Sequence, residues 1–146
     1  MEARGLFGKG GFTLLEMMVV ILILGILASI IVPRFVGQTD EAKHKAAMVQ
    51  IRNLEDALNL YRIDNSVYPT TEQGLEALVV KPSVAPEPMH WREGGYIPKV
   101  PPDPWGRSYV YLSPGSHGEY DLLSYGADGE PGGDGKNADV ESWDLK

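Results

Sequence analysis

Residues 12–32 are almost uniformly hydrophobic, and their only polar side chains are those of Thr13, Glu16 and Ser29. At 1.5 Å of rise per residue, about 20 apolar residues are enough for a helix to cross a hydrocarbon layer of roughly 30 Å. The transfer free energy of so many Leu, Ile and Val side chains outweighs the cost of about 2.5–3.5 kcal/mol for one central carboxylate. We therefore predict that residues 12–36 form a membrane-spanning helix.

A cleaved secretory signal peptide is the alternative interpretation of an N-terminal apolar run. This run is longer than the usual core of a signal peptide, and no A-x-A-like cleavage site follows it in "IIVPRFVGQTDEAKHKAAM". A short polar leader, "MEARGLFGKGG", precedes the run instead. The pattern favours a removable leader over residues 1–11 and a retained apolar helix.

A second pattern of hydrophobic residues, at spacings of four and three, follows in residues 37–66 and is typical of an amphipathic helix. Its apolar stripe consists of Ala47, Ile51, Leu54, Leu58 and Tyr61. We expect this helix to continue the first one, with a possible bend or local loss of helix at Gly25 or Pro33, and to end near Asp64 and Asn65. The stripe requires a small domain to cover it.

The next segment carries the signals of a short helix and a loop. Thr70, with Gln73 three residues later, is typical of a capping box, which predicts a helix that extends to about Val79. The prolines of "KPSVAPEP" then predict an irregular loop, because proline lacks a backbone donor.

Two runs of β-prone residues, 108–112 and 120–125, are separated by Ser, Pro and Gly and predict an antiparallel hairpin. A third short strand is expected before or after it. The predicted fold class is therefore α+β: a long N-terminal helix, membrane-spanning in its first half, packs on a small antiparallel sheet within a globular head at residues 67–146.

The acidic, glycine-rich stretch "DGEPGGDGKNAD" lies near the C-terminus. Carboxylates are hard oxygen ligands and glycines allow tight turns, so Ca²⁺ is the metal that such a loop suits best. The spacing partly matches an EF-hand loop, but Gly132 stands at position 5, and position 12 holds Asp139 instead of glutamate. A solvated acidic turn that binds no metal is the alternative, because Asp–Gly pairs are common in turns.

The chain of 146 residues has a formal net charge of −7 and no cysteine. Its acidity argues against a nucleic-acid partner, because surfaces that bind the phosphate backbone are usually basic. His44, His90 and His117 lie in unlike contexts, without the cysteines or nucleophile motifs of zinc sites and hydrolases. These features indicate a structural protein and not an enzyme.

The stretch "GFTLLEMMVVILILGILASIIVP" resembles the class III signal of type IV pilins and pseudopilins. In that family a prepilin peptidase cleaves between glycine and phenylalanine, which implies a cut between Gly11 and Phe12 and N-methylation of Phe12. The resemblance makes Glu16 the assembly residue. Because an ionisable group in a membrane usually faces a partner, we expect Glu16 to pair with the Phe12 amine of a neighbouring copy. A side chain that only reaches the membrane interface is the alternative.

Four later blocks narrow the resemblance to the major pseudopilin family of type II secretion systems: "YPTTEQGLEAL", "GGYIPKVPPDPWG", "YLSPGSHGEYDLLSYGADG" and "ADVESW". Type IV pilins usually end in a disulfide-closed loop, which this chain cannot form. Major pseudopilins hold one calcium ion in the corresponding loop through aspartates and carbonyls. This implies Asp128 and Asp139 as ligands, with the carbonyls of Tyr125, Glu130 and Lys136 as further candidates.

The resemblance also implies a function. We expect a single-pass inner-membrane protein with a periplasmic head, which polymerises into a helical fibre, the pseudopilus, and supports protein export. The implied partners are further copies of the chain, minor pseudopilins, an inner-membrane assembly platform and the prepilin peptidase. Two alternatives stay open: a type IV pilin of a surface fibre, and a monomeric membrane-anchored calcium-binding domain.

Overall fold

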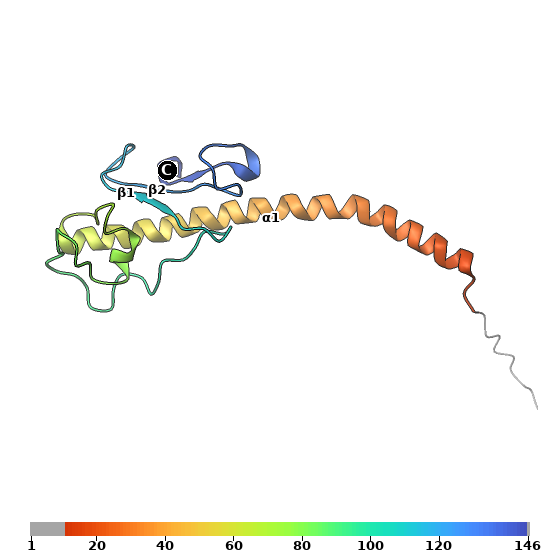
Figure 1. The fold of residues 1–146 in the computed structure, drawn as a ribbon, viewed down its shortest axis with the longest axis horizontal. Helices are drawn as coiled ribbons and strands as arrows, with labels where there is room; N and C mark the ends of the chain where they lie inside the picture. The colour runs from red at the N-terminus through yellow and green to blue at the C-terminus, as the bar shows by residue number, and fades with distance from the viewer. Residues whose placement is uncertain (1–10, 146) are drawn as a thin grey trace, which may run out of the picture. The chain divides into compact units, whose positions relative to one another are not determined.

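The computed structural model describes residues 11–145, except for the side chains of residues 30–38. The chain divides into two compact units, an N-terminal unit of residues 1–38 and a C-terminal unit of residues 39–146. One long helix, α1 (Leu14–Asn65), contributes to both (Figure 1). All but the last residue of the predicted leader lies outside the described residues.

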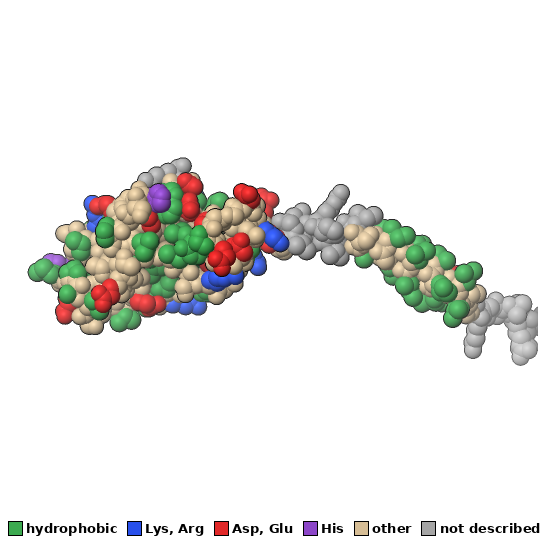
Figure 2. Space-filling view, turned by 45° about the horizontal axis from the view of Figure 1, so that its top comes forward, with side chains coloured by type: hydrophobic (Ala, Val, Ile, Leu, Met, Phe, Trp, Pro, Cys, Tyr) green, Lys and Arg blue, Asp and Glu red, His purple; other side chains and the backbone are tan. Residues whose placement is uncertain are grey.

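In the N-terminal unit, α1 is hydrophobic on every side. Each Phe, Leu, Ile, Val and Met side chain from Phe12 to Leu27 is at least 45 % exposed, and hydrophobic side chains cover the face of this segment that Figure 2 shows. The assigned helix continues through Gly25 and Pro33, where the sequence allows a break. Among the described residues, no helix reaches the length and apolarity of a membrane span. Residues 30–36 of the predicted span lie outside the described side chains.

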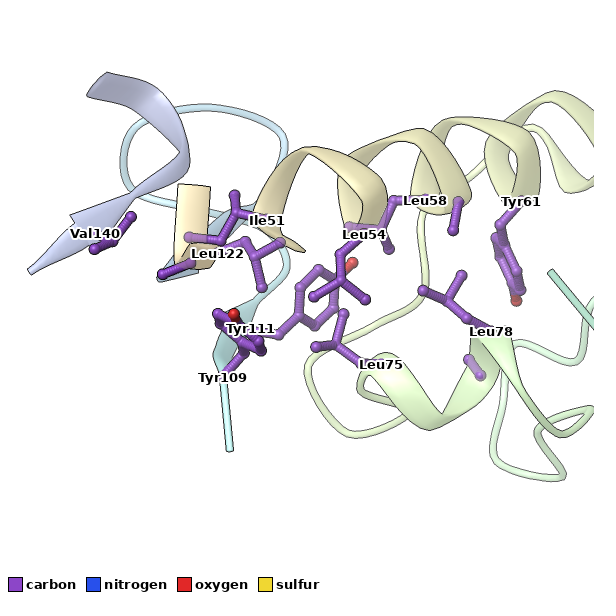
Figure 3. Packing of buried hydrophobic residues seen from close by; sticks show 13 residues of the cluster. Ile51, Leu54, Leu58, Tyr61, Leu75, Leu78, Tyr109, Tyr111, Leu122 and Val140 are labelled. Carbon is purple, nitrogen blue, oxygen red and sulfur yellow. The ribbon is translucent and has the colours of Figure 1, made fainter. Parts of the chain in front are cut away.

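The part of α1 in the C-terminal unit forms one wall of the hydrophobic core. All five residues of the predicted stripe, Ala47, Ile51, Leu54, Leu58 and Tyr61, are at most 2 % exposed, which confirms the stripe. Side chains from the segments after α1 cover them, among them Leu75, Leu78, Tyr109, Tyr111, Leu122 and Val140 (Figure 3). Burial of each large apolar side chain contributes about 1.5–3 kcal/mol. The helix ends at Asn65, as predicted.

A three-stranded antiparallel sheet, in the order β1-β2-β3, lies beside this part of α1 (Figure 1). The predicted hairpin consists of β1 (Val110–Leu112) and β2 (Asp121–Ser124), which are shorter than the β-prone runs. The third strand, β3 (Val140–Glu141), follows the hairpin and pairs with β2. The buried Asp121 carboxylate accepts the N–H groups of Ser116 and His117 at 2.8 and 3.0 Å, which closes the hairpin loop.

The predicted second helix is wrong in its type and length. Its capping box is present, because the Thr70 N–H donates to Gln73 Oε1 at 3.0 Å and the Gln73 N–H donates to Thr70 Oγ1 at 3.2 Å. Only a four-residue 3₁₀ helix, η1 (Leu75–Leu78), follows this pair. Gly74 has a φ of +61°, a left-handed conformation that a right-handed helix cannot contain.

Tyr111 provides a test of the core. Its hydroxyl donates to the Pro69 carbonyl at 2.8 Å, and burial raises the pKa of Tyr111 from 10.0 to about 12. The neutral phenol therefore stabilises the fold fully below pH 10, and this contribution is lost as the pH rises through about 12. Denaturant unfolding at a series of alkaline pH values should show a shallower loss of stability for Tyr111→Phe than for the native chain. At neutral pH the substitution should cost about 1 kcal/mol, the value of the lost hydrogen bond. If the free energy of unfolding fell equally steeply with rising alkaline pH in the two proteins, the buried, hydrogen-bonded state of the Tyr111 phenol would be contradicted.

Candidate functional site

The predicted cleavage site lies just before α1. Gly11 and Phe12 are outside regular secondary structure, and the Phe12 side chain is 81 % exposed. A peptide bond in an exposed, irregular segment is accessible to a peptidase, whereas one inside a helix is protected by the backbone hydrogen bonds. The helix start at Leu14 therefore leaves the predicted cut accessible.

Glu16 caps its own helix. Its Oε2 atom accepts the Thr13 N–H at 3.3 Å, and its own N–H donates to Thr13 Oγ1 at 3.2 Å. These reciprocal bonds form a capping box and satisfy two backbone donors at the helix start. The signature is visible in "TLLE", but the sequence-based prediction missed it and considered for Glu16 only a partner in another copy or the membrane interface. Within the single chain, Thr13 is the partner of Glu16.

The second predicted site is the C-terminal loop, residues 125–139, which connects β2 to β3. Two hydrogen bonds fold it back on itself: the Gly129 N–H donates to the Tyr125 carbonyl, and the Ala127 N–H donates to the Lys136 carbonyl, each at 3.2 Å. The short η2 helix (Gly135–Asn137) precedes β3. The backbone passes so close to itself that a Cβ atom on Gly126 would lie 2.6 Å from the Ala138 carbonyl oxygen.

The two predicted aspartate ligands lie in this loop with different surroundings. Asp128 Oδ1 accepts the Glu130 N–H at 3.1 Å, and Asp139 Oδ2 accepts the Gly132 N–H at 2.8 Å. Asp139 Oδ1 is buried and has no hydrogen-bond partner within the described part of the chain. A buried carboxylate oxygen without a partner is costly, so this atom fits a site for a cation.

Negative charge accumulates around Asp139. Burial raises the pKa of Glu141, and the neighbouring Asp144 and Asp139 carboxylates raise it further. Over residues 11–145, no group of three or more His, Cys, Asp or Glu side chains is arranged to hold a metal ion. A metal here would therefore need backbone carbonyls as well. The Lys136 carbonyl already lies 3.1 Å from His44 Nε2, on α1.

Near the C-terminus the chain forms a third 3₁₀ turn, η3 (Ser142–Asp144), beside the sheet. The Trp143 indole stacks on the His117 imidazole with ring centroids 3.9 Å apart and an interplanar angle of 11°. The His117 Nδ1 atom lies 3.2 Å from Asp121 Oδ2. Although burial acts to raise the pKa of Asp121, the hydrogen bonds from the loop backbone and His117 outweigh it and lower that pKa. No sequence pattern indicated this pair of rings, because the two residues are far apart in the chain.

The chain matches two family models: "Type II secretion system (T2SS), protein G" over residues 34–143, and "Prokaryotic N-terminal methylation motif" over residues 6–32. The chain belongs to the type II secretion system protein G family. The type II secretion system core protein G of Vibrio cholerae serotype O1 is 56 % identical to it, over 93 % of this chain and 92 % of that protein. The core protein G of Escherichia coli K12 is 50 % identical, over 92 % and 91 %.

The similarity extends to the fold. A crystal structure of the major pseudopilin from the type 2 secretion system of enterohaemorrhagic Escherichia coli superposes with a TM-score of 0.66 at 45 % identity. The superposition covers 75 % of this chain and 93 % of the crystallised chain.

Membership in the protein G family confirms the predicted pseudopilin resemblance and favours it over a type IV pilin of a surface fibre. The family is one of structural secretion components and is not a known enzyme family. The calcium ligands and the assembly role of Glu16 stay predictions.

Two glycines of the loop allow its close packing to be tested. Gly126 and Gly135 have nearly equal φ values, +64° and +60°, but an added Cβ atom would meet backbone only at Gly126. Gly135→Ala should cost about 1–2 kcal/mol, the strain of a left-handed L-residue. Gly126→Ala carries the same strain plus a steric clash, so its unfolding free energy should fall clearly further. If denaturant unfolding gave equal losses of unfolding free energy for the two variants, the close contact between Gly126 and the Ala138 carbonyl would be contradicted.

Proposed function

We propose that this chain is the structural subunit of a type II secretion pseudopilus. The observation that carries the proposal is the exposed hydrophobic surface of residues 12–27, most of which belong to α1. A helix that is apolar on every side is not stable in water and requires lipid or other protein around it. Together with the family, this surface supports a subunit that is held in the inner membrane and then polymerises.

Two different environments would cover the apolar helix in turn. Before assembly, residues 12–36 cross the inner membrane, with the C-terminal unit in the periplasm. After the prepilin peptidase removes residues 1–11, the helices of many copies exchange lipid for one another and form the core of a helical fibre. Head-to-tail contacts that do not close into a ring produce an open filament. Minor pseudopilins and an inner-membrane assembly platform act on this fibre during protein export.

Glu16 would set the register of the copies. Cleavage creates a positive amine on Phe12, close in sequence to the carboxylate. In a lipid-free helical core, a carboxylate without a partner costs several kcal/mol, so a copy docked out of register is disfavoured. The Thr13 capping box supports this role, because it orients the carboxylate but does not neutralise its charge, which leaves the amine of a second copy as the charged partner. A monomeric calcium-binding domain would need the apolar helix but not this charge.

Replacement of Glu16 tests the pairing. Glu16→Ala should leave membrane insertion and leader removal intact but strongly reduce the yield of fibres, because the Phe12 amine loses its partner. Glu41→Ala is the control, since it removes an exposed carboxylate, paired with Lys45, farther along the same helix. Fibre yield is measured by electron microscopy and by cross-linking of N-terminal segments, and mass spectrometry of the mature N-terminus reports cleavage and methylation. Normal fibre yield with Glu16→Ala would refute the pairing.

We further propose that the C-terminal loop binds one Ca²⁺ ion. Asp128 and Asp139 would provide carboxylate oxygens, and the carbonyls of Tyr125, Glu130 and Lys136 would complete a shell of hard oxygen ligands. The buried Asp139 Oδ1 without a hydrogen-bond partner supports this assignment. The ion would have a structural role: it would neutralise the local charge and order a glycine-rich loop in a chain without disulfides.

Removal of the metal tests this part of the proposal. At a calcium concentration about 100 times Kd, mass action adds about 2.7 kcal/mol, which should raise Tm by roughly 10 °C relative to chelator. Asp139→Asn should abolish most of this difference. Asp134→Asn removes the same charge from an exposed position of the same loop and should preserve it. Equal melting of the native chain in calcium and in chelator, with no bound calcium, would exclude the site.

A further inference from the structure

The side chain of Arg107 holds the turn that contains Asp128. Its Nη1 atom donates to the Gly126 carbonyl at 3.0 Å and to the Ala127 carbonyl at 3.2 Å. On the other side of Asp128, the guanidinium lies against Gly129, where an added Cβ atom would be 2.6 Å from Arg107 Nε. One planar cation therefore contacts the residues on both sides of the first proposed metal ligand.

The backbone of Arg107 is itself fixed by a buried carboxylate. Asp103 is 3 % exposed, and its Oδ1 atom accepts the N–H groups of Trp105 at 3.0 Å and Arg107 at 2.8 Å. Its Oδ2 atom accepts the Ser124 hydroxyl at 2.5 Å, at the end of β2. The Asp103 N–H also donates to the Arg107 carbonyl at 2.7 Å. This turn ties Arg107 to the strand from which the C-terminal loop departs.

The two halves of the loop are held in different ways. Residues 125–129 are held by Arg107 and by the bond from the Gly129 N–H to the Tyr125 carbonyl. Residues 130–138 contact the Asp139 carboxylate through the Gly132 N–H. Near its end, the Lys136 carbonyl also accepts the Ala127 N–H and lies 3.1 Å from His44 Nε2. Residues 130–133 therefore depend most on the Asp139 carboxylate, which is still short of one partner.

We propose that Arg107 is a positioning residue for the C-terminal loop, which holds the Asp128 turn in its ligand-binding conformation before any metal is present. Calcium then has to order only residues 130–138. The consequence for calcium rests on the calcium site proposed above, whereas the positioning of the turn does not.

Arg107 can act on calcium binding in two opposite ways. Its charge repels a nearby cation, which weakens binding, and its hydrogen bonds preorganise a ligand, which strengthens binding. The repulsion is screened because Arg107 is exposed to solvent. The ordering of several glycine-rich residues is a larger cost, because each of them loses backbone freedom. Preorganisation should therefore dominate.

Hydrogen exchange on the full mature chain in detergent micelles tests the positioning role. In chelator, Arg107→Ala should increase the exchange of the Ala127 and Gly129 amides by about tenfold or more, because their turn loses its clamp. The β2 amides, such as Leu122, should keep their protection and show that the fold is intact. Arg107→Lys keeps the charge but not the planar group that bridges two carbonyls, so its effect should be intermediate. Arg92→Ala, which removes an arginine paired with Asp64, is the charge-matched control.

A calcium titration of the same proteins completes the test. Arg107→Ala should bind Ca²⁺ about tenfold more weakly than the native chain and the Arg92→Ala control, because the metal must also order residues 125–129. Unchanged exchange at residues 127–129 in chelator would overturn the proposal, as would tighter calcium binding by Arg107→Ala. If the native chain bound no calcium, the calcium site would be refuted, and the exchange measurement alone would still decide the role of Arg107.

Discussion

A hydrophobic surface that surrounds a helix has to be covered, and residues 12–27, most of which form the first part of α1, present such a surface. The C-terminal unit buries a stripe of its own, from Ala47 to Tyr61. In the function proposed above, lipid and then other copies of the chain provide the cover for residues 12–27. The same helix is thus apolar on all sides in one unit and amphipathic in the other, which is the pattern expected of a subunit that is anchored first and polymerised later.

Within that apolar surface, the position of Glu16 in the first turn is as important as its charge. The capping box with Thr13 satisfies backbone donors that a helix start leaves free. In a low-dielectric environment an unpaired N–H donor costs several kcal/mol, and an unpaired carboxylate costs more. The carboxylate and the helix start therefore stabilise each other in a single subunit, and the proposed pairing with a neighbouring amine adds a charged partner to a group that is already oriented.

Local sequence patterns predicted the features that depend on residues close together in the chain. The stripe, the end of α1 at Asn65 and the hairpin all follow from local spacing and turn residues. The second helix could not be predicted correctly, because a glycine in the sequence does not reveal that Gly74 takes a positive φ. For the site, the aspartates were predicted from composition and resemblance. The contacts of Arg107 and the unpaired oxygen of Asp139 could not be, because they join segments that are distant in the sequence.

The C-terminal loop matters to the fold because of the strand that follows it. β3 has only two residues and pairs with β2 through Leu123 with Glu141 and Ser124 with Val140, yet Val140 belongs to the buried core. So short a ladder cannot order the preceding loop, which loses much backbone freedom when β3 is in register. Contacts that hold part of the loop in place therefore act directly on the burial of Val140. On this argument, Arg107 and the proposed calcium ion stabilise the same edge of the core from the two halves of one loop.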